Sequence, residues 1–299
     1  MKQLFFIILL VLIGNSVNAQ LSLKTEYLGN SKYHPKDGKS STGEEGSAWL
    51  YQGNLKLPLS ISNDSIPKIW GVDVAGAVVN LNNTHLTRNE VVSHITNLQV
   101  SLFHLRPLKN NWSLLAFAGA GIYTAENSLK RIKSNQILGN AGAIFIKKMN
   151  KNLELGGGAV LNNAFGYPML FPAFYFNYSY EGRYEVKASV MNGLELLAGY
   201  TFYENFALYF TATINAQLAL LETNDNDKKV IFTHQYIIVG LQPELKINKH
   251  MRIPITVGMN ATRFAYFTDR NLKSVFQDSE NDAHFGISPY AGIELKVKF

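Results

Sequence analysis

Apolar residues recur at every second position along most of the chain. The clearest stretch runs from Asn205 to Leu220, where apolar side chains fall on one face and polar side chains on the other. A period of two places successive side chains on opposite faces of a β-strand, and helical periodicity is nearly absent. The stretch is longer than most strands of soluble sheets, but it suits a tilted strand that crosses a bilayer. The pattern therefore predicts an all-β fold with long strands.

Segments with this pattern follow one another along the chain, and the links between them alternate in length. Candidate strands lie at 21–28, 47–62, 67–81, 91–105, 112–124, 136–148, 152–162, 169–179, 183–191, 194–203, 205–221, 230–247, 250–263 and 285–299. Links after even-numbered strands are short and polar, whereas links after odd-numbered strands are mostly longer. Only Asn192-Gly193 breaks this rule, and the pair has the composition of a type I′ hairpin turn.

This alternation of links decides the architecture. Short turns at one end and long loops at the other, with an even number of strands, are typical of outer-membrane barrels. We therefore predict a transmembrane, antiparallel, up-and-down β-barrel of about 14 strands, with 12 or 16 as alternatives. Both termini are expected in the periplasm.

The C-terminal strand has two very different faces. Its apolar face ends on an aromatic residue at the last position and consists of Ile293, Leu295, Val297 and Phe299. An ordinary amphipathic strand would show the same alternation. The ending nevertheless resembles the last strand of bacterial outer-membrane barrels, which the barrel-assembly machinery reads. We expect these four residues to form the assembly signal.

The N-terminus has the pattern of an export signal. A basic residue, Lys2, precedes the apolar segment 4–13, and small residues stand at Val17 and Ala19. The apolar segment is too short to span a bilayer, so we predict a cleaved signal peptide at 1–19 and a barrel at 20–299. The chain contains no Cys, which excludes a disulfide-stapled domain and a lipid anchor on cysteine.

Composition supports a membrane barrel. The charged fraction is 17%, below the roughly 25% usual in soluble proteins. The mature part has no apolar run long enough for a membrane helix, and a closed barrel is the other fold that satisfies its backbone within lipid. The net charge of +6 comes from scattered basic residues on an exported chain, so no nucleic-acid partner is expected. The expected location is the bacterial outer membrane, and the expected partners are its lipid and lipopolysaccharide.

Aromatic residues gather near the predicted strand ends, where barrels carry girdles at the two membrane surfaces. They are Trp49, Tyr51, Trp70, Trp112, Tyr123, Tyr178, Tyr180, Tyr200, Tyr203, Tyr266 and Tyr290. Strands favour aromatic residues in any case, so this distribution only supports the barrel.

Four loose motifs, which together span most of the mature chain, resemble a family of outer-membrane barrel proteins of unknown function, DUF6268, of a Bacteroidetes type. They lie at 66–71, 172–178, 192–196 and 292–299. The resemblance implies a barrel, and it implies no substrate, cofactor or catalytic residue.

Polar residues on the inward faces of the predicted strands are the candidate lumen lining. They are Asp73, Gln99, Glu185, Lys187, Glu195, Gln217, Glu244, Lys246, Arg252, Glu294, Lys296 and Lys298. We expect the interior of such a barrel to be too wide for side chains to fill. The charges can then pair across the wall as structural struts, or border water and tune selectivity for a small solute. Neighbouring strands are expected to place Glu244 and Lys246 beside Arg252. Pairing of the first and last strands is expected to set Lys24 near Lys296, where water or Glu26 and Glu294 would offset the like charges.

Candidate chemistry is sparse. The seven His residues show no metal-ligand spacing, and neither HExxH nor GxSxG occurs. His234 is expected to be a lumen or interface residue rather than a base. Gly156-Gly157-Gly158 lacks the Lys-Ser/Thr pair of a phosphate loop and indicates a close backbone approach or a kink. No catalytic, cofactor or metal residues are assigned.

The loop at 264–284 is a candidate lid, because Leu272, Val275 and Phe276 would share one face of a short helix. The leading functional hypothesis is a passive pore or a substrate-specific channel. A closed barrel that serves envelope structure or surface interaction is the alternative, and an outer-membrane hydrolase is less favoured. A soluble exported β-protein is the alternative at the level of the fold.

Overall fold

The computed structural model describes residues 19–36, 43–62, 64, 67–87, 90–127, 131–190, 193–222, 229–271, 273 and 283–299. Nearly all of the predicted signal peptide lies outside the described residues. So do the three predicted lid residues, Leu272, Val275 and Phe276. Within the described residues, no helix is long and apolar enough to cross a bilayer.

The described part is almost entirely β-structure. The elements are β1 (Gln20–His34), β2 (Glu45–Ile61), β3 (Ile69–Thr84), β4 (His94–Pro107), β5 (Trp112–Thr124), the short 3-10 helix η2 (Ser134–Gln136), β6 (Ile137–Lys148), β7 (Leu153–Asn162), β8 (Met169–Tyr180), β9 (Tyr184–Val190), β10 (Leu194–Tyr203), β11 (Phe206–Glu222), β12 (Lys229–Lys246), β13 (Met251–Asp269), β14 (His284–Phe285) and β15 (Ser288–Lys298). Each predicted strand has its counterpart, and β14 and β15 are two parts of the predicted last strand.

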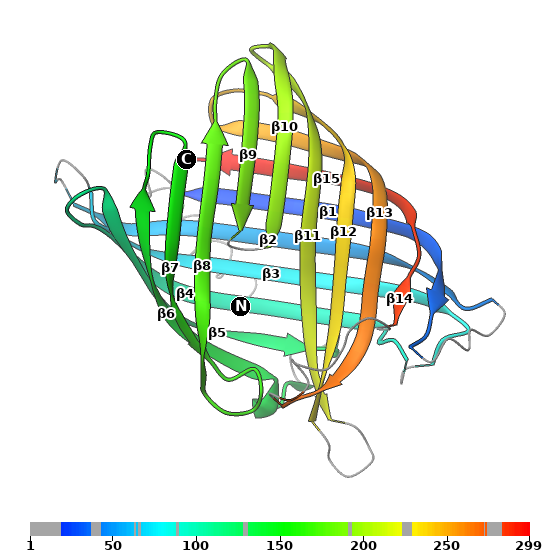
Figure 1. Ribbon diagram of the computed structural model, residues 1–299. Helices are drawn as coiled ribbons and strands as arrows, with labels where there is room; N and C mark the ends of the chain where they lie inside the picture. The colour runs from blue at the N-terminus through cyan, green and yellow to red at the C-terminus, as the bar shows by residue number, and fades with distance from the viewer. Residues whose placement is uncertain are drawn as a thin grey trace, which may run out of the picture.

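The sheet closes into a ring of fourteen antiparallel strands, with β14 and β15 counted as one (Figure 1). Consecutive strands pair from β1 to β13, β13 pairs with β15, and β15 pairs with β1. The closing register sets Lys24 opposite Glu294 and Ser22 opposite Lys296. The predicted antiparallel barrel of about 14 strands is confirmed.

The two ends of the barrel differ, as the link lengths predict. We call one the turn end, since it carries the short links after the even-numbered strands β2 to β12. Ala19 and Phe299 also meet there, where the Phe299 amide donates a hydrogen bond of 2.8 Å to the Ala19 carbonyl. We call the other the loop end, since it carries the longer links.

The outer surface is apolar, because the alternate side chains that project from it are mostly the apolar ones of each strand. Exposed aromatic residues mark its turn end: Trp70, Trp112, Tyr180, Tyr184 and Tyr203. A smaller group marks the loop end on β1 and β2, where the rings of Tyr27 and Trp49 lie 4.8 Å apart. Two residues assigned to girdles from the sequence are placed wrongly, since Tyr123 and Tyr290 face the interior, where each donates a hydrogen bond to a polar side chain.

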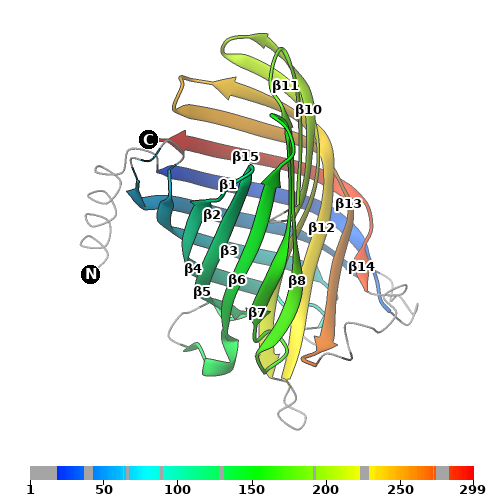
Figure 2. The same cartoon turned by 60° about the vertical axis from the view of Figure 1, so that its left-hand side comes forward.

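Close packing fills the interior at the loop end. The barrel is flattened there, so that β11–β13 cross over β1–β4 at a steep angle (Figures 1 and 2). Their inward side chains meet those of β14, β15 and two of the links in one apolar cluster, which we call the loop-end core: Leu28, Tyr33, Ala48, Leu50, Val79, Leu81, Val91, Val92, Ile95, Ala219, Phe232, Tyr236, Ile238, Ala265, Ala283, Phe285 and Tyr290. The expectation that the interior is too wide to be filled is therefore wrong for this end, because the expectation assumed a round cross-section.

Candidate functional site: a polar cavity in the barrel

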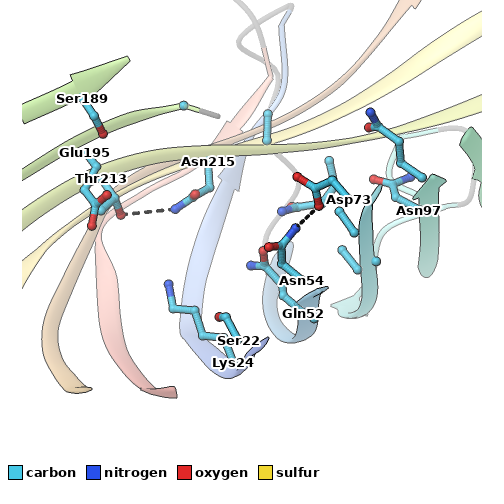
Figure 3. Close-up of a pocket in the computed structure, with 18 of the residues that line it drawn as sticks. Ser22, Lys24, Gln52, Asn54, Asp73, Asn97, Ser189, Glu195, Thr213 and Asn215 are labelled. Atoms are coloured by element: carbon cyan, nitrogen blue, oxygen red, sulfur yellow. Dashed lines mark hydrogen bonds between the residues drawn. The ribbon is translucent and has the colours of Figure 1, made fainter. Parts of the chain in front are cut away.

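A polar cavity of about 730 Å³ lies beside the loop-end core. Its walls come from β1–β5 and the adjoining β15 on one side and from β8–β11 on the other (Figure 3). Amide and hydroxyl side chains dominate the lining: Ser22, Gln52, Asn54, Asn97, Gln99, Ser101, Tyr123, Tyr175, Asn177, Ser189, Thr213, Asn215 and Gln217. The cavity can therefore offer many hydrogen bonds to a bound molecule or to water.

The structure divides the predicted lumen residues into two groups. Six line the cavity: Asp73, Gln99, Glu195, Gln217, Glu294 and Lys296. Six others project from the inward faces of β9, β12, β13 and β15 outside the cavity lining: Glu185, Lys187, Glu244, Lys246, Arg252 and Lys298. The second group belongs to the wall of the turn end.

Charged groups in the cavity stand in pairs. Lys296 lies 3.2 Å from Glu294, and Lys24 lies 2.8 Å from Glu26. The two lysines come from adjacent strands, as the sequence predicts, and Glu26 and Glu294 offset their like charges. Across the cavity, Glu195 provides a further exposed carboxylate.

Hydrogen bonds between neighbouring strands orient the uncharged lining. The Asn54 amide donates to the Asp73 carboxylate at 2.6 Å, and Asn215 donates to the Thr213 hydroxyl at 3.2 Å (Figure 3). Because these bonds use only part of each amide's capacity, the remaining donors and acceptors can serve a ligand.

A second polar group ties strands together at the turn end. Glu185 accepts hydrogen bonds of 3.0 Å from Thr201 and from Tyr209, and the Lys246 ammonium lies 3.5 Å away. Beside it, Arg252 lies 3.5 Å from Glu244, as the sequence predicts. These contacts act as struts in the wall, because Glu185 of β9 reaches inward side chains of β10, β11 and β12, and Arg252 of β13 reaches Glu244 of β12.

The interior is open to solvent at the turn end. Lys56, Arg252 and Lys296 all face inward there, yet their side chains are 40%, 46% and 44% exposed. Inward side chains of the loop-end core such as Leu28 and Phe232 are fully buried. A solute therefore meets an open vestibule at one end and a packed core at the other.

Glu26 lies at the boundary between cavity and core, and it is fully buried. Besides Lys24, it accepts hydrogen bonds from Tyr236 at 3.0 Å and from Tyr290 at 2.6 Å, and a third from Gln52. Glu26 is absent from the predicted lumen lining, although it is expected to offset the charge of Lys24. The available signal was strand parity, since Glu26 alternates with Lys24 and Ser22 on the inward face of β1.

His234 packs in the interior beside the cavity residue Gln217. His234 is fully buried, and its Nδ1 lies 3.0 Å from the Gln217 side-chain oxygen. No group of three His, Asp or Glu side chains able to hold a metal ion occurs in the part of the chain that the structure describes. The glycine run in β7 marks a close backbone approach, as expected, since a Cβ on Gly158 would lie 2.0 Å from the Ala143 carbonyl oxygen.

The barrel wall has a notch beside the cavity, because the β9–β10 hairpin is short. Strand pairing between β8 and β11 ends in one row, Phe176–Val190–Leu194–Ile214. Beyond this row β8 continues as Met169–Tyr175 and β11 as Asn215–Glu222, and no described strand lies between them (Figure 1).

Side chains take the place of the missing strand along β11. Asn97 of β4 donates to the Leu218 carbonyl at 2.6 Å and accepts from the Leu218 amide at 3.4 Å. Gln136 donates to the Leu220 carbonyl at 3.3 Å. The free edge of β11 is thus tucked inside the barrel, against β4–β6.

A latch of polar contacts bridges the far side of the notch. Arg270 donates to the carbonyls of Asn135, Asn163 and Ala164 at 2.6–3.1 Å. Lys133 also pairs with Glu222 at 2.8 Å. The loops after β5, β7 and β13 are thereby held together above the notch.

The ring of strands, the apolar outer surface and the polar cavity together define a transmembrane β-barrel. Residues 15–298 match the model of DUF6268, a domain of unknown function. The chain therefore belongs to the DUF6268 family.

Solved structures with similarity to the chain are bacterial outer-membrane barrels. They include an outer-membrane channel from Pseudomonas putida F1 (9% identity, 95% of this chain and 96% of that chain covered, TM-score 0.45), the Pseudomonas putida toluene transporter TodX (10%, 97% and 93%, 0.42) and the translocator domain of the autotransporter NalP from Neisseria meningitidis (12%, 100% and 94%, 0.35). No curated protein matches the chain. Similarity at this level does not carry a function to the chain.

Proposed function

We propose that the chain is an outer-membrane barrel that acts as a substrate-specific channel for small polar solutes. The observation that carries this proposal is the polar cavity, which is continuous with inward charges that solvent reaches at the turn end. A purely structural barrel gains nothing from such a cavity, because every buried polar group in it must be satisfied at a cost. The packed loop-end core argues for a selective channel rather than a wide passive pore.

The surroundings of the barrel belong to the same proposal. The signal peptide at 1–19 would direct export. Ile293, Leu295 and Val297 on the outward face of β15, together with Phe299, which directly follows the strand, would be read by the barrel-assembly machinery. The apolar outer surface would contact outer-membrane lipid and lipopolysaccharide, and both termini would lie in the periplasm. No catalytic role is part of the proposal.

Conductance in planar bilayers tests the proposal. We expect small current steps from the purified, folded protein. The double variant Lys24→Glu and Lys296→Glu should shift the reversal potential in a salt gradient toward cation selectivity, since both lysines belong to the cavity charges.

Lys109→Glu combined with Lys151→Glu is the matched control, because the two substitutions make the same charge change in exposed turns. A folded protein that never conducts above background would contradict the channel. The fully buried loop-end core would then favour the second candidate, a closed barrel that serves envelope structure or surface interaction.

A further inference from the structure

The cavity reaches the outer surface of the barrel through the notch between β8 and β11. Strand parity shows this, because nearly all side chains that line the cavity point inward. The exceptions are four outward-facing residues that gather at the notch: Phe176, Leu194, Ile214 and Ala216. Gly53 and Gly76 stand at outward positions away from the notch and line the cavity with their backbone, whereas at the notch no described strand closes the wall and the cavity reaches its outer side. We call this passage the window, and the row Phe176–Val190–Leu194–Ile214 its sill.

The window lies at membrane depth. With a rise of about 3.3 Å per residue and a tilt of about 45°, the sill at Val190 stands roughly 14 Å from Tyr184 along the membrane normal. That is near the middle of an apolar band of about 25 Å. Leu170 and Phe174 on β8, beside the window, are 69% and 74% exposed on the outer face. The window therefore faces hydrocarbon rather than water.

One side of the window is a free strand edge, whose backbone groups need hydrogen-bond partners. Within the part of the chain that the structure describes, β8 has no strand partner along Met169–Tyr175 on its β9 side, and unpaired backbone groups are costly in lipid. Pro172 lies in this segment, and proline in a sheet is confined largely to edges. Polar groups of a molecule at the inner side of the window would form hydrogen bonds with the free backbone edge of β8, whereas the sill itself is apolar.

The polar inner side of the window and its apolar sill together indicate which kind of molecule could bind there. The inner side offers hydroxyl, amide and carboxylate groups at Ser189, Thr213, Asn215 and Glu195, and the lysines of the cavity are already paired with carboxylates. An uncharged, hydroxyl-bearing head group suits this lining better than an anion or a cation, because no cluster of one charge sign awaits it. The sill and the outer face of β8 suit an alkyl chain.

We propose that the window is a lateral binding and exit site for a single-chain amphiphile whose uncharged, hydroxyl-rich head group lies in the cavity while its tail crosses the sill into the membrane. The inference rests on the proposed channel, because it supplies a side exit that the packed loop end denies to such a molecule.

Photolabelling of the full-length barrel in phosphatidylcholine vesicles tests the window. The probe is dodecyl glucoside with a photoreactive diazirine on the sugar, so that only a head group inside the barrel labels the cavity. We expect labels on Ser189, Glu195, Thr213 and Asn215. Excess dodecyl maltoside should suppress them, whereas equal free maltose should not.

Two variants on one strand face give the matched comparison. Leu194→Trp fills the sill, and Leu196→Trp places the same bulk on the outward face of β10 away from the window. Labelling should fall about tenfold in Leu194→Trp, the effect of two methylene groups losing their apolar contact, and remain unchanged in Leu196→Trp. Heat-modifiable gel mobility verifies folding, and the competition on the natural protein decides the question if Leu194→Trp does not fold.

Three results would overturn the window: no label in the cavity, equal competition by free maltose, or equal labelling of the two tryptophan variants. Each leaves the channel intact if the same preparation conducts in planar bilayers. Cavity labelling without any conductance would instead sustain the binding site and contradict the channel.

Discussion

The two halves of the barrel interior are built from the same strands but have opposite character. At the turn end, inward positions carry charged and amide side chains, and Lys56, Arg252 and Lys296 remain 40–46% exposed. At the loop end, the same strands turn apolar side chains inward, and these are fully buried where β11–β13 press on β1–β4. The interior is therefore a polar vestibule that ends on a hydrophobic core.

The contrast shows that apolar packing, which stabilises the fold, is concentrated at the loop end, whereas hydrated polar side chains are concentrated at the turn end. Across a flattened barrel, apolar side chains from opposite walls can bury one another, which contributes the largest favourable term in packing. Across a rounder section they cannot meet, so the inward face must be polar and wet. The flattening of one end thus decides what the interior can hold at the other.

The largest expected loss of stability comes from a substitution in the loop-end core. Phe232→Ala removes a fully buried ring that packs 4.9 Å from the ring of Phe267, and it should cost about 3–5 kcal/mol of unfolding free energy. Urea unfolding of the reconstituted barrel measures it. Phe210→Ala is the control, because Phe210 is 52% exposed on the outer face of the adjacent strand. Equal losses in both variants would mean that the loop end has no core of its own.

The next effect concerns the boundary between the halves. Glu26→Gln keeps the shape of a buried carboxylate but leaves Lys24 without its charge partner, and it should cost about 1.5–3 kcal/mol, the range for hydrogen bonds to charged groups. Glu294→Gln should cost less, because that side chain is 17% exposed and can be hydrated. Thermal or urea unfolding compares them, and a larger loss at Glu294 would show that the boundary lies nearer the turn end than burial indicates.

The smallest effect lies outside both halves, in the turn after β2. Hydrogen bonds from the Lys68 ammonium and the Ser62 hydroxyl lower the pKa of Asp64, whose carboxylate lies 2.8 Å from Lys68. A lowered folded-state pKa adds stability above the ordinary carboxyl pKa of about 4, and this is lost as the pH falls through the folded value. Asp64 is fully exposed, so Asp64→Asn should leave the unfolding midpoint unchanged at neutral pH and in acid. A clear pH-dependent difference would show that the turn contributes to the fold.

Much of the architecture follows from the sequence because strand parity is a local property. Alternation placed most strand boundaries within a few residues and set Glu294 and Lys296 on the inward face. It ended β1 and β13 six residues too early at the loop end, at Leu28 and Arg263 instead of His34 and Asp269. The pairing of Arg252 with Glu244 followed from the hairpin that joins β12 and β13, since a hairpin fixes the register of its own strands.

Contacts across the interior could not be predicted from the sequence. The alternation of side chains shows which face of the sheet a residue lies on, but it does not show how the sheet curves. Glu26 meets Tyr236 and Tyr290, which are 210 and 264 positions away. The alternation of apolar and polar residues in β1 would be the same if Tyr236 and Tyr290 were separated from Glu26 by water. The short link at Asn192-Gly193 was visible in the sequence as an exception, but its meaning depends on how far β8 and β11 continue beyond it.

The amide of Asn97 that holds the edge of β11 also bears on the order in which the barrel forms. The Asn97–Leu218 contact joins residues 121 positions apart, and closing a flexible loop of that length costs about 4 kcal/mol by the logarithmic law. Hairpins from β4 to β11 shorten that loop step by step as they pair. The bond therefore belongs to the late, cooperative stage of folding, when the wall on both sides is already built.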